Sequence, residues 1–181
     1  MRQSKTDSHI IFIFYLELIQ QCRFAKLSIE DISTYSSPDK HSSERIYYAI
    51  QNFLTSLGII STILWPTKHK ERGYELRKKL KVRDDSVLRN RKFRNHFIHF
   101  NERVENWAEA FEIRGFSDWN IGSWDGVSLP SELIRVRTFD PKTWMLTFRD
   151  EEFNLLPAVK AIDELYDAVQ SKISQPGKKR N

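Results

Sequence analysis

Apolar side chains recur every three or four positions along most of this chain, which is the spacing of amphipathic helices. Residues 8–27 show this spacing, and residues 43–64 show it more regularly. Ser42 and Ser43 are both suitable N-caps for the second segment, and Pro66 prevents its continuation. The pattern therefore predicts two long helices joined by a polar connection over 28–41.

The rest of the chain predicts three further helices and one β-hairpin. A basic segment over 70–82, an aromatic-striped segment over 87–113 and a last segment over 155–173 have helical spacing. Apolar and polar residues alternate over 132–150 on both sides of an Asp-Pro turn. We expect a mainly α protein, an up-and-down helical bundle of about four or five helices with a small β-hairpin before the C-terminal helix.

Composition narrows the class of protein. The 181 residues suffice for one domain, which we place at 1–173, before a basic tail over 174–181 that we expect to be disordered. Cys22 is the only cysteine, so an intramolecular disulfide and a cysteine-based zinc site are excluded, and a reducing, cytoplasmic setting fits best. The apolar run 10–16 ends at Glu17, far short of the roughly 20 residues that span a bilayer. We therefore expect a buried first helix and no membrane segment.

Positive charge is concentrated in one part of the chain. The formal net charge is +5, but residues 68–94 hold twelve lysines and arginines against four acids, a local net charge of +8. Such a segment fits a polyanionic partner such as RNA. It equally fits a solvated helix face that keeps the protein soluble.

The candidate chemistry lies at the end of this basic segment, in Arg94-Asn95-His96-Phe97-Ile98-His99. An imidazole can accept and donate protons near pH 7, and a guanidinium can hold two phosphate oxygens with its planar fork. These groups can cleave RNA without a metal, because a base removes the 2′-hydroxyl proton, a cation stabilises the crowded phosphate and an acid protonates the leaving oxygen. The products would carry 2′,3′-cyclic phosphate and 5′-hydroxyl ends.

The spacing from Arg94 to His99, with Asn95 directly after the arginine, resembles the Arg-x4–6-His signature of the HEPN domain superfamily. The continuation Phe100-Asn101-Glu102-Arg103-Val104-Glu105-Asn106-Trp107 resembles uncharacterised bacterial members of this group. The resemblance implies a helical bundle, a homodimer with both motifs in one composite cleft, and ribonuclease activity. It further implies a role as a toxin or in phage defence, in some members neutralised by a nucleotidyltransferase-like antitoxin.

On this interpretation Arg94, Asn95 and His99 are the catalytic residues, and Asn95 positions the arginine or the phosphate. No metal and no cofactor is required. Flanking residues would contact RNA phosphates and make binding depend on salt. These candidate RNA-binding residues are Arg89, Arg91, Lys92, His96 and Arg103.

The motif leaves alternatives open. On one continuous helix, positions five apart lie about 140° from each other, so Arg94 and His99 would need a helix start, a long arginine or a second subunit to meet. Arg91 and His96 stand at the same spacing, in a second register. The protein could also be a non-catalytic module of the same fold that binds RNA, nucleotide or protein. Finally, His96, His99 and Glu102 could form a helical metal site.

Three tryptophans near the predicted hairpin have two interpretations. Trp119, Trp124 and Trp144 could stack on the bases of single-stranded RNA. Plugging the open end of the bundle is the better fit, because Trp144 alternates with Leu146 and Phe148 on one predicted strand face.

Overall fold

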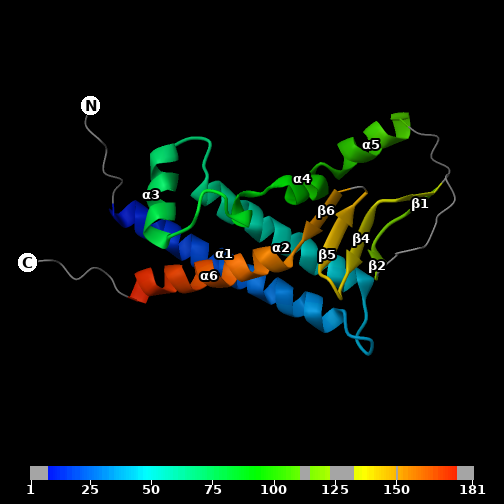
Figure 1. The fold of residues 1–181 in the computed structure, drawn as a ribbon, viewed down its shortest axis with the longest axis horizontal. Coiled ribbons are helices and arrows are strands. Elements are labelled where there is room, and N and C mark those ends of the chain that lie inside the picture. The colour runs from blue at the N-terminus through cyan, green and yellow to red at the C-terminus, as the bar shows by residue number, and fades with distance from the viewer. Residues whose placement is uncertain (1–7, 111–114, 123–132, 150, 175–181) are drawn as a thin grey trace, which may run out of the picture.

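Helices make up most of the structure, and a small sheet precedes the last helix (Figure 1). The structure, a computed structural model, describes residues 8–110, 115–122, 133–149 and 151–174. The predicted tail lies outside the described residues from 175 onward. The helices are α1 Ser8–Tyr35, α2 Ser43–Leu64, α3 Lys70–Leu80, α4 Lys92–Ile98, α5 Phe100–Ala110 and α6 Leu156–Ser174, with a 3₁₀ turn at Val87–Arg89. The strands are β1 Gly115–Ser117, β2 Asn120–Ile121, β3 Leu133–Arg135, β4 Arg137–Asp140, β5 Met145–Phe148 and β6 Glu151–Asn154.

Three long helices form the body of the protein, with α2 and α6 both packed along α1 (Figure 1). α6 runs from the sheet toward the end of the molecule where α1 begins. Each helix contributes a fully buried stripe to the shared core, for example Leu18 and Ile32 of α1, Ile50 and Phe53 of α2, and Ile162 of α6. Removing each such side chain from water contributes roughly 1.5–3 kcal/mol, so this interface dominates the stability of the fold.

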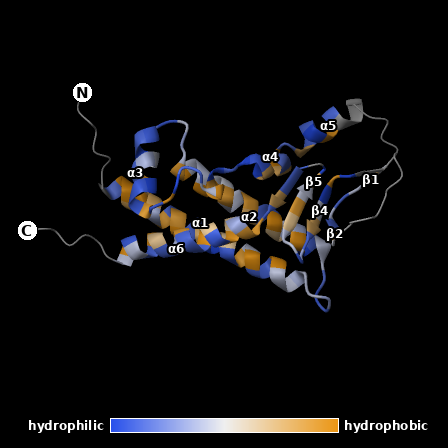
Figure 2. Ribbon diagram, viewed as in Figure 1, coloured by the Kyte–Doolittle hydropathy of each residue, from blue (hydrophilic) through white to orange (hydrophobic). Residues whose placement is uncertain are grey.

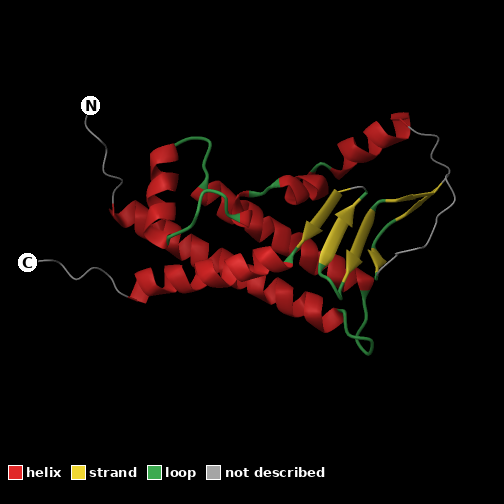
Figure 3. Cartoon of the chain, in the orientation of Figure 1, coloured by secondary structure: helices red, strands yellow, loops and turns green. Residues whose placement is uncertain are grey.

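A four-stranded sheet in the order β2-β4-β5-β6 lies at the end of the long helices where α6 begins (Figure 3). The predicted hairpin is confirmed as β4 and β5, which pair antiparallel with Thr138 opposite Thr147. The sheet is larger than predicted, because β6 extends it and β2, from a segment predicted as a loop, pairs parallel to β4. Phe139, Leu146 and Phe148 are buried and join the sheet to the helical core.

The fold separates the tryptophans. Trp144 lies in the turn between β4 and β5 rather than on a strand face, with φ 57°, and packs edge-on against Phe139 with 6.1 Å between ring centroids. Trp119 is 49% exposed. Trp144 therefore packs against the sheet and Trp119 is half exposed, while Trp124 lies outside the described residues.

α1 differs from its prediction in length and in burial. It continues through residues 28–35, where the sequence predicts a connection, and ends before Pro38. One face is buried, whereas the face that carries Ile13, Leu16 and Leu27 remains about half exposed. The prediction of a buried first helix is thus correct for one face only, because α2 and α6 both pack on the same side of α1.

α2 has its predicted range, and the Oγ of Ser42 accepts a hydrogen bond from Arg45 N (3.3 Å) at its start. Among the described helices it alone is long and apolar enough to cross a membrane, and 67% of that stretch is buried inside the protein. Figure 2 shows the contrast with α3, which is mostly hydrophilic. Because most of α2 is buried by the rest of the protein, its apolar composition is explained by its place in the core.

The predicted continuous helix over 87–113 is wrong. It divides into a 3₁₀ turn, α4 and α5, with a second break at His99. Asn90 Oδ1 accepts a hydrogen bond from Lys92 N (2.8 Å), which starts α4. His99 has φ −100° and ψ 34°, outside the helical region, so α5 leaves α4 in a new direction (Figure 1).

Gly73 allows α3 to approach the C-terminal end of α2. A Cβ at this position would lie 2.7 Å from the carbonyl oxygen of Leu64 and closer still to the ring of Pro66. Neither atom can move independently of the backbone, so Gly73→Ala should separate the two helices. We expect a loss of roughly 1–3 kcal/mol in the free energy of unfolding, which exceeds the gain in helix propensity of about 1 kcal/mol.

Urea unfolding of Gly73→Ala and of Tyr74→Ala tests this expectation. Tyr74 is the next residue of α3 and is exposed, so its replacement should change stability by less than about 0.5 kcal/mol. A Gly73→Ala protein as stable as the wild type would show that the close approach is not required.

Candidate functional site

Arg91 is bound inside the protein. Its guanidinium donates hydrogen bonds to Ser61 Oγ (2.9 Å), Ser61 O (3.0 Å) and Trp65 O (2.7 Å) at the C-terminal end of α2. Carbonyls at a helix C-terminus form the negative end of the helix dipole, so a cation is stabilising there, and Ser61 O accepts from Trp65 N (2.8 Å) as well. Burial, with a further contribution from the charge of Arg94, lowers the pKa of Arg91. Nε and Nη2 of Arg91 therefore cap α2, and the contact of Arg91 with RNA stays a prediction.

Arg94 rests on the bare backbone of α2. A Cβ at Gly58 would lie 3.1 Å from Arg94 Nε and 3.2 Å from its Cγ, so the absence of a side chain at Gly58 makes room for the arginine. Nη1 donates a hydrogen bond to Asn95 Oδ1 (3.1 Å), and the buried Nε has no partner among the described residues. Arg94 and Asn95 thus form an oriented pair, and the nearby charge of Arg91 adds to the positive potential around it.

His99 occupies the junction between α4 and α5. Its side chain is 49% exposed, and its Nδ1 lies 3.3 Å from Glu102 Oε1. A carboxylate beside Nδ1 favours the tautomer that carries its proton there, which leaves Nε2 as the nitrogen not engaged by Glu102. An exposed imidazole held in this way can exchange protons with a ligand.

The helix break changes the geometry expected for the motif. The backbone N–H of His99 donates to Asn95 O (2.9 Å), so these two residues remain one helical turn apart. His99 itself has left the helical conformation, and the separation expected on an ideal helix no longer describes its direction from Arg94. In the described part of the chain, Asn95 is linked to both Arg94 and His99, and no hydrogen bond joins the arginine to the histidine.

His96 is the second predicted RNA-binding residue that the fold buries. Its side chain is 2% exposed and stacks on Phe148 at 4.5 Å between ring centroids, with an interplanar angle of 14°. Its Nε2 lies 2.7 Å from Glu151 Oε2, and Lys92 Nζ lies 2.9 Å from the same oxygen. His96 therefore anchors α4 on the sheet and is corrected as an RNA contact, because no surface remains for a ligand.

Burial lowers the pKa of His96 from its ordinary value of 6.5, against the opposing effects of the hydrogen bond and charge of Glu151. Below pH 6.5 the unfolded chain takes up a proton that the folded protein does not yet bind. The stability of the protein should therefore fall as the pH decreases through this window, by at most about 1.4 kcal/mol per pH unit for one proton.

Urea unfolding at pH 7.5 and at pH 5.5 measures this dependence. His96→Phe keeps the stacking ring and removes the titration, so it should lose part of the decrease that the wild type shows. His41→Ala, at an exposed histidine in the loop before α2, should keep the whole decrease. If the free energy of unfolding falls equally between pH 7.5 and pH 5.5 in the wild type and in His96→Phe, the titration of His96 is not the cause of the decrease.

The remaining candidate RNA-binding residues lie at the surface. Arg89, Lys92 and Arg103 are exposed, although Lys92 also pairs with Glu151. Elsewhere in the basic segment the arginines serve packing more than the lysines do. Arg77, for example, donates to Leu64 O and lies over the ring of Trp65. Part of the positive charge of residues 68–94 therefore belongs to arginines that bind other groups of the protein.

The metal interpretation fails on geometry. His96 Nε2 is directed to Glu151 on the sheet, while His99 and Glu102 bind each other beyond the helix break. Among the described residues, no group of three or more His, Cys, Asp or Glu side chains is arranged to hold a metal ion. The three residues spaced as ligands along the sequence therefore do not converge.

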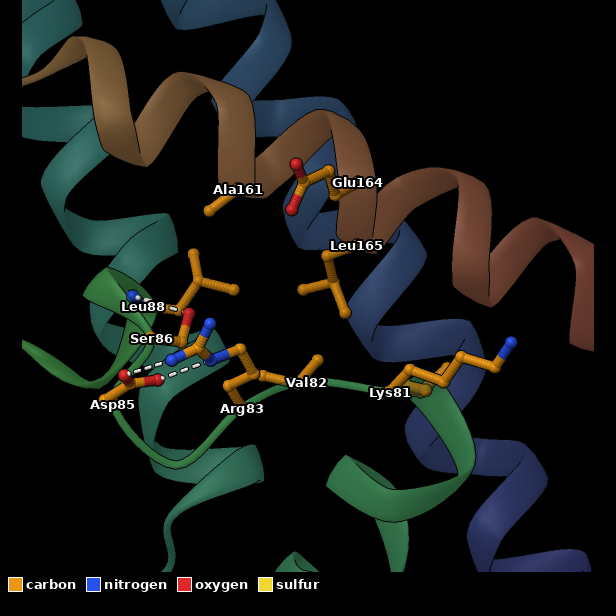
Figure 4. A pocket seen from close by; sticks show the side chains of 10 residues that line it. Lys81, Val82, Arg83, Asp85, Ser86, Leu88, Ala161, Glu164 and Leu165 are labelled. Atoms are coloured by element: carbon orange, nitrogen blue, oxygen red, sulfur yellow. Dashed lines mark hydrogen bonds and ion pairs between the residues drawn. The ribbon is translucent and has the colours of Figure 1, made fainter.

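Two surface cavities lie away from the motif. One, of about 360 Å³, is formed by α6 and the segment between α3 and the 3₁₀ turn. Arg83 and Asp85 pair within it, and Glu164 and Leu165 of α6 lie opposite (Figure 4). The other, also about 360 Å³, lies on the sheet between β4 and β6. Neither is lined by Arg94, Asn95 or His99.

The sequence did not reveal the role of Glu151. This carboxylate lies 55 positions from its partner His96, in β6, which falls between the predicted hairpin over 132–150 and the predicted last helix. Comparison of the chain with protein-family models, curated proteins and solved structures finds no match. The case for function therefore rests on the residues themselves.

Proposed function

We propose that this protein is a metal-independent endoribonuclease in which Arg94, Asn95 and His99 act on one phosphodiester. The observation that carries the proposal is that Asn95 links an oriented guanidinium, that of Arg94, to the backbone of His99, whose imidazole is exposed. Nη1 of Arg94 is held by Asn95, and Asn95 O is held by the backbone of His99. Arg91 lies close enough to affect the same electrostatic environment, and its Nε and Nη2 are bound to the end of α2.

Each of these residues would have a separate role in the cleavage reaction. His99 removes the proton from the 2′-hydroxyl group, and a histidine with a carboxylate neighbour suits this role near neutral pH. Arg94 stabilises the charge that develops on the phosphate oxygens, which is usually the larger catalytic effect. In a homodimer, His99 of the second subunit could protonate the leaving oxygen. The ends produced are 2′,3′-cyclic phosphate and 5′-hydroxyl.

The proposal places the chain in the HEPN superfamily, as an up-and-down bundle of about four or five helices that carries the sheet as an addition. It includes a homodimer, a cytoplasmic location, which the buried lone Cys22 suits, and a role as a toxin or phage-defence effector with a possible nucleotidyltransferase-like antitoxin. The second candidate is a non-catalytic binding module of the same fold. It is favoured by one observation, that no hydrogen bond joins Arg94 to His99 in the described single chain.

Incubation of the purified protein with end-labelled single-stranded RNA and with tRNA, in EDTA, tests the proposal. We expect fragments with 2′,3′-cyclic phosphate and 5′-hydroxyl ends. Sedimentation of the same sample determines whether the protein is a dimer. RNA that binds and remains intact would favour the binding module over the nuclease.

A further inference from the structure

A cavity of about 470 Å³ lies between the N-terminal half of α2 and the segment just before β2. Its aromatic walls are Tyr47 and Tyr48 of α2 and Trp119, and Gln51 lines it from the next turn of α2. Tyr48 is 62% exposed and Trp119 is 49% exposed, whereas Tyr47 is buried. Two large, partly exposed aromatic rings therefore line one open hollow.

The backbone holds Trp119 in this position against its own preference. Its φ is 57°, in the left-handed region that a bulky side chain rarely adopts. Its N–H donates to Asp118 Oδ1 (2.9 Å), which also accepts from Arg137 N (3.1 Å) and Nε (2.9 Å). Strain of this kind persists only where surrounding contacts impose it, and it is concentrated at ligand-binding sites.

Buried groups support the ring from below. Tyr47 stacks on Trp119 with 6.4 Å between ring centroids, and its hydroxyl donates to Asn120 O (2.9 Å). The side chain of Asn120 in turn donates to Arg137 O (2.9 Å) and accepts from Ser117 Oγ (2.6 Å). The exposed tryptophan is thus preorganised, which reduces the entropy lost when a ligand stacks on it.

The cavity adjoins the candidate catalytic motif. The guanidinium of Arg137 lies over the rings of Tyr47 (5.8 Å), Phe97 (5.3 Å) and Phe100 (4.7 Å), and the last of these follows His99 directly. Gln51 and Gly58 share one face of α2, separated by two helical turns or about 10 Å. A short single strand can therefore reach from the cavity to the guanidinium of Arg94.

We infer that this cavity binds an unstacked nucleobase of single-stranded RNA between Trp119 and Tyr48, and so positions the RNA for the motif. The inference rests on the proposed function only in taking RNA as the ligand. Base stacking on aromatic rings tolerates any sequence, and Gln51 and Glu44 offer polar groups to the edge of the base. The lining carries one arginine, Arg45, beside one acid, Glu44, and Arg137 is paired with Asp118, so the aromatic rings rather than a net charge favour a nucleobase here.

Binding of fluorescein-labelled single-stranded RNA, measured by anisotropy in the His99→Ala background so that no cleavage intervenes, tests the inference. Trp119→Ala and Tyr48→Ala should each weaken binding by about tenfold. Trp119→Phe, which keeps a stacking ring, should recover most of the affinity. Tyr74→Ala and Phe116→Ala remove equally exposed rings outside the cavity and should bind like the parent.

An abasic strand of the same length separates stacking from charge. Trp119→Ala should not change the affinity for this strand, because it offers no base. If Trp119→Ala binds the base-bearing RNA like its parent, or weakens both strands equally, the stacking site is wrong. If RNA binding depends on Trp119 but the wild type cleaves no RNA, the stacking site is supported and the nuclease proposal is wrong. If the wild type cleaves RNA but neither binding nor cleavage depends on Trp119, the nuclease proposal is supported and the stacking site is wrong.

Discussion

Replacement of His99 by alanine is expected to slow RNA cleavage at least about a hundredfold while leaving the fold intact. The side chain is half exposed, and the hydrogen bond to Glu102 is its one side-chain contact that the structure identifies. Its loss should therefore cost little stability. Arg94→Ala should have a comparable effect on the rate, because it removes the cation that stabilises the phosphate. Initial rates at a saturating RNA concentration, in EDTA, give the comparison.

Two variants sharpen this experiment. Arg94→Lys keeps the charge but loses the planar fork, so it should recover only part of the activity. His41→Ala removes an exposed histidine outside the motif and should cleave at the wild-type rate. If His99→Ala is folded and cleaves as fast as the wild type, His99 is not the base and the nuclease mechanism is wrong.

Arg91→Ala is expected to lower the free energy of unfolding by roughly 3 kcal/mol, which corresponds to about 6–12 °C in the melting temperature of a chain of this size. The substitution removes three hydrogen bonds from a charged donor and leaves Trp65 O without that partner, whereas Ser61 O still accepts from Trp65 N (2.8 Å). It also removes the positive charge that interacts favourably with the negative end of the α2 dipole. Thermal unfolding followed by circular dichroism measures the change.

The matched control is Arg89→Ala, two positions earlier in the same basic segment. Arg89 is exposed, and its side chain makes a long hydrogen bond of 3.5 Å from Nη1 to Asp84 O. Loss of this side chain should therefore change the free energy of unfolding by less than about 0.5 kcal/mol. Arg91→Lys should fall between the two, because an ammonium cannot bridge two carbonyls in the way a guanidinium does. Equal melting of Arg91→Ala and wild type would show that the cap is dispensable.

The local elements follow closely from the sequence. The range of α2 is as predicted because its apolar spacing, its serine N-cap and Pro66 all act within a few residues. The β4–β5 hairpin follows from alternation around one turn, which is also local. The prediction was wrong where distant contacts outweighed periodicity. The stripe of Phe93, Phe97 and Phe100 has helical spacing, yet the chain is pinned to α2 at Arg91 and leaves the helix at His99.

The sequence by itself determined that the protein is mainly helical, which residues form α2, and that the candidate arginine and histidines lie in the short segment 94–99. Only the tertiary structure decided the part each of them plays. Arg91 and Arg94 are three residues apart in one basic run, and one caps a helix while the other lies oriented beside it. His96 and His99 likewise differ because Glu151 and Phe148, more than 50 positions away, bury the first ring and leave the second exposed. Burial and pairing depend on which elements meet in space, and no local pattern of residues encodes that.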